Sequence, residues 1–132
     1  MIVIDASVVV DALATPTPNP ALAQRLDRDD DFRAPHLIDV EFASAMRRLV
    51  SEGQLTADRA ADALSDLHAL RIVRYPHLSL VDRMWELRNN LTAYDAAYVA
   101  LAEILEVPFV TCDARLASSP GHQAKIELFT SS

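Results

Sequence analysis

The hydrophobic positions of this chain follow two alternating patterns. Short apolar runs rich in β-branched residues are typical of buried strands, and apolar residues that recur every three or four positions are typical of amphipathic helices. The predicted strands are IVID (residues 2–5), FRAP (32–35), RIVRY (71–75), PFVTC (108–112) and KIELF (125–129). One predicted helix begins at Ser7, a good N-cap residue, and the others cover residues 21–29, 36–52, 57–70, 79–90, 93–105 and 113–118.

Turn and cap residues support these boundaries. Three prolines between Thr15 and Pro20 predict a loop. Gly53 is suited to end the helix before it, and Thr56 and Thr92 are suited to cap the helices that follow them. Because helices separate the strands, we expect right-handed crossovers and a parallel sheet that is covered on both faces. The expected fold is therefore α/β, a three-layer α/β/α sandwich whose central parallel sheet has four to five strands.

Length and composition restrict the class of protein. A chain of 132 residues without a linker or internal repeat is expected to form a single domain, residues 1–132. The one cysteine, Cys112, excludes an internal disulfide and fits a reducing compartment. No apolar run approaches the roughly 18 residues of a membrane span, and the N-terminus lacks the pattern of a signal peptide. We therefore expect a cytoplasmic protein without a membrane partner. With two glycines, the chain cannot build a Gly-rich phosphate cradle.

Four acidic residues stand at the ends of elements where sites form in open parallel sheets. Asp5 and Asp113 each follow a predicted strand, so their side chains reach the same crevice if those strands are neighbours. Glu41 and Asp95 lie in the first turns of two predicted helices. The helix face that carries Asp95 is mostly apolar, which makes this the most unusual acid in the chain.

Each acid also has a simpler interpretation. Asp5 and Asp113 are suited to cap the helices that follow them. Asp95, three residues after Thr92, fits a capping box and the positive end of a helix dipole. Glu41 alone is typical of a surface acid. The site hypothesis rests on the coincidence of all four at one edge of the sheet.

A cluster of four carboxylates favours a particular chemistry. Such groups repel one another, and a hard divalent cation such as Mg²⁺ or Mn²⁺ relieves the repulsion. Ions of this kind activate water and stabilise phosphoryl transfer, so the pattern favours phosphodiester hydrolysis with metal-activated water. The net charge of −7 argues against nucleic-acid binding through a broad basic surface. Four of these negative charges would lie in the pocket, where two divalent cations would neutralise them.

Several segments, in order, resemble the PIN domain, and more narrowly the VapC-type toxin ribonucleases of toxin–antitoxin pairs. The resemblance spans essentially the whole chain, through IVIDAS, HLIDVEFASAMRRL and LTAYDAAYVALAEILEVPFVTCDARLA. It implies a catalytic and metal-binding quartet of Asp5, Glu41, Asp95 and Asp113, with supporting hydroxyls on Ser7 and Thr111. It also implies Mg²⁺- or Mn²⁺-dependent endonucleolytic cleavage of RNA, a homodimer, and inhibition by a cognate VapB-like antitoxin.

Within that quartet we expect Asp5 and Asp95 to ligate the principal metal. Asp113 and Glu41 would complete the shell or orient the attacking water. Arg115 is a candidate contact for an RNA phosphate, although an exposed arginine is the commoner interpretation.

Two other functions remain open at this point. One is a catalytically silent PIN-like binding module. The other is a phosphoacceptor signalling domain, which would need paired acids after the first strand and a lysine at the end of a late strand. Here Ala6 follows Asp5, and Lys125 opens its strand instead.

Overall fold

Five short strands form the sheet at the centre of the molecule. The computed structural model describes residues 1–130. Its strands are β1 (Ile2–Ile4), β2 (Phe32–Pro35), β3 (Ile72–Tyr75), β4 (Phe109–Thr111) and β5 (Ile126–Leu128). They lie in the order β3-β2-β1-β4-β5, and each neighbouring pair is parallel. The carboxyl ends of β1 and β4 therefore lie side by side.

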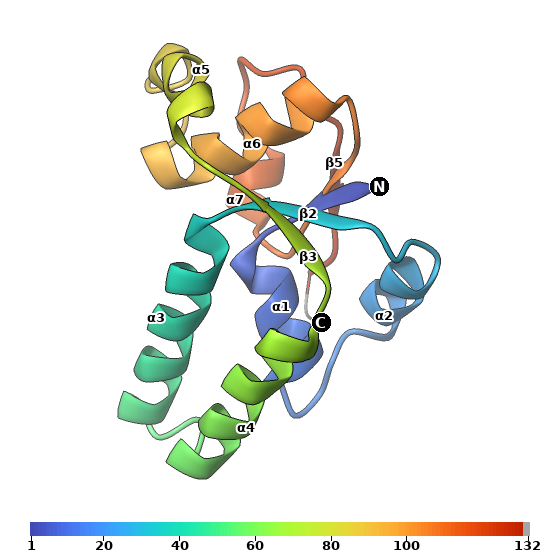
Figure 1. Cartoon of the computed structure of the whole chain (residues 1–132), viewed down its shortest axis with the longest axis vertical. Helices are drawn as coiled ribbons and strands as arrows, with labels where there is room; N and C mark the ends of the chain where they lie inside the picture. Colours follow the sequence, from blue (N-terminus) through green and yellow to red (C-terminus); the bar gives the residue numbers. More distant parts are fainter. Residues whose placement is uncertain (131–132) are drawn as a thin grey trace.

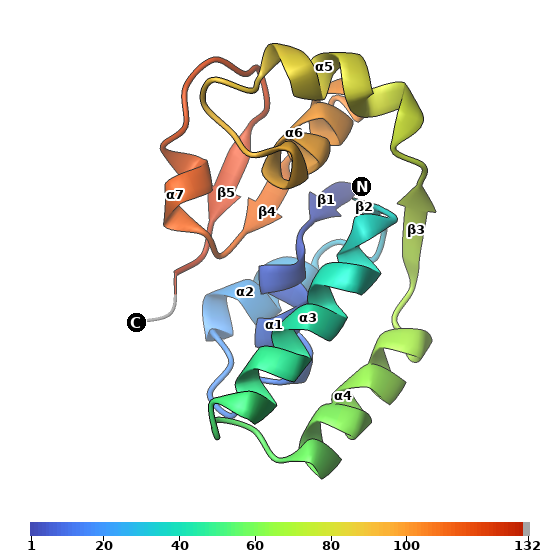
Figure 2. The same cartoon turned by 90° about the vertical axis from the view of Figure 1, so that its left-hand side faces the viewer.

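Helices cover both faces of this sheet, which confirms the predicted α/β/α architecture. They are α1 (Ala6–Leu13), α2 (Pro20–Asp27), α3 (Leu37–Ser51), α4 (Ala57–Ala69), α5 (Val81–Glu86), α6 (Ala93–Leu105) and α7 (Ala114–Ala117), with a 3₁₀ turn η1 (Leu78–Leu80). On one face α1, α3 and α4 pack against one another, and on the other α6 lies against the sheet with α5 beside it (Figures 1 and 2). Within residues 1–130, none of these helices has the length and hydropathy needed to cross a lipid bilayer.

The core lies along β1 and α6. All three residues of β1 are buried, as a central strand between two covered faces requires. Every residue of α6 from Ala96 to Ala102 is buried too, because this helix is enclosed by the sheet on one side and by α5 on the other. Four of these seven residues are alanines, whose small side chains let the helix approach the strands closely.

Two elements differ from the sequence prediction. The first helix begins at Ala6, and its N-cap is Asp5 rather than Ser7, because the Asp5 carboxylate accepts the Val8 N–H. The predicted helix over residues 79–90 is the turn η1 followed by six residues of α5. No side chain caps α5, and helix-disfavouring asparagines follow its end. By contrast, Gly53 has the expected positive φ of 74° just past α3.

Candidate active site

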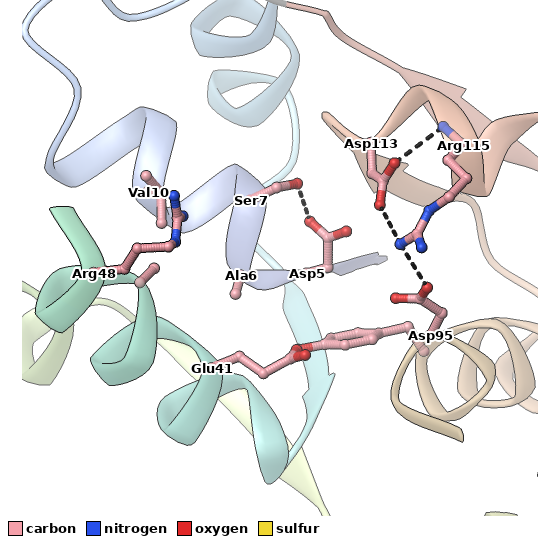
Figure 3. A pocket seen from close by; sticks show the side chains of 11 residues that line it. Asp5, Ala6, Ser7, Val10, Glu41, Arg48, Asp95, Asp113 and Arg115 are labelled. Carbon is pink, nitrogen blue, oxygen red and sulfur yellow. Dashed lines mark hydrogen bonds and ion pairs between the residues drawn. The ribbon is translucent and has the colours of Figure 1, made fainter. Parts of the chain in front are cut away.

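The four acids come from different elements and line a single pocket. The pocket has a volume of about 400 Å³ and lies where the carboxyl ends of β1 and β4 meet the first turns of α1, α3 and α6 (Figure 3). Asp5, Glu41, Asp95 and Asp113 all contribute to its lining. The sheet order explains this convergence, because residues that follow neighbouring parallel strands emerge at the same edge.

Asp5 is the most enclosed of these acids. Its side chain accepts hydrogen bonds from Ser7 Oγ and Thr111 Oγ1, each at 2.5 Å, and from the Val8 N–H at 3.3 Å. Only 5% of the residue is exposed. Burial raises the pKa of Asp5 from 3.8 to about 6, although the three hydrogen bonds favour the charged form. Asp5 thus caps a helix and lines the pocket, so the two interpretations of this residue are compatible.

The hydroxyls of Ser7 and Thr111 do more than hold Asp5. Ser7 Oγ also accepts the Cys112 N–H at 3.0 Å, and Thr111 Oγ1 accepts the Asp113 N–H at 3.1 Å. The two hydroxyls therefore connect the start of α1 to the chain that leaves β4. This network fixes the orientation of the Asp5 carboxylate, and it sets the backbone position of Asp113.

Asp95 and Asp113 face the same arginine. Nη2 of Arg115 lies 3.1 Å from Asp95 Oδ2 and 3.2 Å from Asp113 Oδ2. Asp113 also caps α7 by accepting the Arg115 N–H, and Thr92 caps α6 by accepting the Asp95 N–H. Burial raises the pKa of Asp95, and the positive charge of Arg115 opposes that rise. The arginine side chain is 71% exposed, so the ion pairs are solvent-accessible and weak.

Glu41 is held by a residue that was not expected at the site. The Tyr98 hydroxyl donates a 2.6 Å hydrogen bond to Glu41 Oε1, joining α6 to α3 across the edge of the sheet. Burial raises the pKa of Glu41, and the hydrogen bond from Tyr98 opposes the rise. The sequence signal for Tyr98 was its position three residues after Asp95, on the same helix face.

The remaining charged side chain of the pocket is Arg48. It lies two turns after Glu41 on α3, and within residues 1–130 its one ion pair is a long contact of 3.9 Å with Glu52. The pocket thus places two arginines beside four acids.

The donor set suits a hard cation, but the acids do not yet form a closed cage. Within residues 1–130, no group of three or more His, Cys, Asp or Glu side chains has the geometry to hold a metal ion. The guanidinium of Arg115 contacts two of the acids, Asp95 and Asp113. The pocket nevertheless suits a hard divalent cation, because its four acids offer carboxylate oxygens as ligands. Burial raises the pKa of three of these four carboxyl groups.

Known proteins share both this sequence and this fold. Residues 2–120 match the family model of the PIN domain. Ribonuclease VapC1 of Mycobacterium tuberculosis is 43% identical over 127 residues, which cover 96% of each chain.

Among solved structures, PAE2754 from Pyrobaculum aerophilum aligns with a TM-score of 0.65 at 23% identity, covering 95% of this chain and 81% of that one. A toxin–antitoxin complex from Klebsiella pneumoniae aligns with a TM-score of 0.60 at 16% identity, covering 89% and 91%. These two likenesses concern the fold. The match to the family model and the identity to VapC1 establish that this chain belongs to the PIN domain family and, within it, to the VapC ribonucleases.

Proposed function

We propose that this protein is a divalent-metal-dependent endoribonuclease that acts as the toxin of a toxin–antitoxin pair. The observation that carries the proposal is the convergence of Asp5, Glu41, Asp95 and Asp113 in one pocket. The name of its relative, a ribonuclease 43% identical over nearly the whole chain, supports RNA as the substrate.

The four acids have the chemistry to hold Mg²⁺ or Mn²⁺. When bound, such an ion would activate a water and stabilise the charge that develops on the phosphate. Asp5 and Asp95 would be the principal ligands, with Asp113 and Glu41 completing the shell. Occupation requires Arg115 to leave the space between Asp95 and Asp113, and its 71% exposure makes that movement inexpensive.

The protein's own groups would position the reactants. Hydrogen bonds on both carboxylate oxygens of Asp5 fix its orientation before substrate arrives. Glu41 engages Tyr98 through Oε1, which leaves Oε2 able to accept a hydrogen bond from a water in the pocket. Because burial raises the pKa of Glu41, its carboxylate is a better proton acceptor than an exposed one. Once released from the acids, Arg115 could reach an RNA phosphate.

A cognate VapB-like antitoxin and a homodimer belong to the same proposal. The toxin–antitoxin complex from Klebsiella pneumoniae has the same fold, which supports a partner of this kind. Co-expression with the neighbouring reading frame, followed by light scattering of the purified material, would measure both assemblies.

The phosphoacceptor alternative fits this pocket less well. Among its lining residues there is no lysine, because Lys125 precedes β5 and so lies at the amino end of that strand. The Asp5 carboxylate is also enclosed by hydroxyls rather than open to a phosphodonor. A catalytically silent binding module would retain the fold without cleaving RNA, so a measurement of RNA cleavage distinguishes that alternative from a nuclease.

Induced expression in cells tests the proposed function. The wild-type chain should arrest growth and produce new RNA ends that accumulate within minutes, as sequencing of total RNA would detect. The Asp5→Asn variant should fold and produce neither effect, and co-expression of the neighbouring reading frame should relieve the arrest. New RNA ends of equal abundance with the Asp5→Asn variant would contradict the proposal.

A further inference from the structure

Tyr98 lines the pocket and contacts Glu41, which lies on a helix of the opposite layer. The residue is 1% exposed, and its hydroxyl donates to Glu41 Oε1 at 2.6 Å. Glu41 lies on α3 and Tyr98 on α6, two helices that cover opposite faces of the sheet (Figure 2).

Packing against the sheet fixes the position of the Tyr98 ring. The ring stacks on Phe109 of β4 with centroids 5.8 Å apart and planes inclined by 7°. The surrounding helix is buried from Ala96 to Ala102, so neither the ring nor its backbone has room to shift. Glu41, by contrast, has a long, partly buried side chain that loses several rotamers when it is held in one place.

Packing alone does not require the hydroxyl. A phenylalanine would make the same stack on Phe109, yet the hydroxyl here is aimed at a carboxylate. Asp95, one turn earlier on α6, lines the same pocket. The hydrogen bond therefore sets where Glu41 lies relative to Asp95.

We propose that Tyr98 is a positioning residue of the active site, whose hydroxyl holds the Glu41 carboxylate in place for the divalent cation and the attacking water. This inference rests on the proposed nuclease function. It assigns the hydroxyl a role through Glu41, beyond the contribution of its ring to the core. Removal of the hydroxyl should therefore weaken metal binding and turnover while leaving the affinity for RNA unchanged.

The Tyr98→Phe variant tests this role. Titration calorimetry with Mn²⁺ should give a dissociation constant raised by about 10- to 100-fold, the usual cost of losing a group that orients a metal ligand. With saturating RNA, kcat should fall by a similar factor and KM for RNA should not change. Tyr94→Phe, on the same helix with a side chain 65% exposed, is the matched control and should behave as wild type. Wild-type values of both the Mn²⁺ dissociation constant and kcat in Tyr98→Phe would overturn the proposal.

A double-mutant cycle separates positioning from a purely structural effect. If Tyr98 acts through Glu41, adding Tyr98→Phe to Glu41→Ala should cause no further loss of Mn²⁺ affinity. A loss of equal size in both backgrounds would show that the hydroxyl supports the fold instead, and would overturn the proposal.

NMR offers a readout that needs neither metal nor the Tyr98→Phe variant. The Tyr98 hydroxyl proton should exchange slowly with solvent in the wild type and rapidly in Glu41→Ala, and equal exchange in both would contradict the pairing.

The outcomes distinguish this inference from the proposed function. If the wild type binds Mn²⁺ and cleaves RNA but Tyr98→Phe does both equally well, the positioning role fails and the nuclease stands. If the wild type neither binds Mn²⁺ nor cleaves RNA, the proposed function fails and the role of Tyr98 in it fails too.

Discussion

Thr111 donates a 2.5 Å hydrogen bond to Asp5 across 106 residues of sequence. The bond exists because β1 and β4 are neighbouring parallel strands, so the residues at their carboxyl ends meet. The hydrogen bond encloses the Asp5 carboxylate, which is already buried, and this desolvated group lines the pocket. The energetic consequences of that arrangement can be measured.

The first prediction concerns the pH dependence of stability without metal. Burial raises the pKa of Asp5 from 3.8 to about 6, so between those values the folded state binds more protons at this site than the unfolded state. The contribution of Asp5 to the free energy of unfolding therefore falls as pH rises from about 4 to about 6. Above this range the ionised carboxylate costs about 3 kcal/mol, by the relation between pKa and free energy.

The Asp5→Asn variant should remove this cost while keeping an N-cap. In EDTA, urea unfolding should show the variant close to wild type at pH 4 and more stable by up to about 3 kcal/mol at pH 7.5. Asp62→Asn, on an exposed position of α4, controls for a general change of charge. An Asp5→Asn effect of the same size at both pH values would exclude the burial of an ionised Asp5 as its cause.

Metal should stabilise the folded protein by mass action. At a Mn²⁺ concentration about 100 times the dissociation constant, binding adds about 2.7 kcal/mol, which for a chain of this size raises Tm by roughly 10 °C. The increase should be much smaller in Asp95→Asn, because that change removes a proposed ligand. Differential scanning calorimetry with Mn²⁺ and with EDTA measures it. A wild-type Tm that is indifferent to millimolar Mn²⁺ and Mg²⁺ would argue against a cation site.

Arg115 should compete with the cation for Asp95 and Asp113. Because its ion pairs are exposed, Arg115→Ala should tighten Mn²⁺ binding by no more than about fivefold. The same variant should raise KM for RNA if the released guanidinium contacts a phosphate. Calorimetry and steady-state cleavage measure the two effects separately.

Arg48→Ala is the matched control for this experiment. It removes a positive charge from the same pocket but breaks no pair with the four acids. If Arg115→Ala weakens Mn²⁺ binding, the arginine organises the acids rather than competing for them. If both variants tighten binding equally, the effect arises from net charge alone.

The sequence predicted the convergence of the acids well where strands position them. The positions of Asp5 and Asp113 after two apolar β-branched runs were enough to predict a shared edge, because parallel strands emerge in register. Glu41 could not be recognised as a candidate from the pattern of strands. As a solitary acid near the start of a helix it is indistinguishable from a surface residue. It became a candidate through its coincidence with the other three acids, and the resemblance to the PIN domain supported that choice.

Other features depended on three-dimensional contacts that a linear pattern does not contain. Tyr98 lies on an apolar stripe and is indistinguishable from a core tyrosine until Glu41, 57 residues away, is seen beside its hydroxyl. Ser7 resembles a helix cap, but Asp5 takes that position and Ser7 donates to it. The helix predicted over residues 79–90 is instead the 3₁₀ turn η1 followed by the six residues of α5, a break that its apolar spacing does not reveal.

Cleavage of purified RNA in vitro is the sharpest test of whether this protein is a metal-dependent nuclease. Total RNA should be incubated with the wild type and with Asp95→Asn, each purified identically, across a titration of Mn²⁺ and in EDTA. We expect fragments from the wild type that increase with Mn²⁺ and disappear in EDTA, and none from Asp95→Asn at any concentration. Cleavage by the wild type that persists undiminished in EDTA, or equal cleavage by Asp95→Asn, would contradict a metal-dependent nuclease built on these four acids.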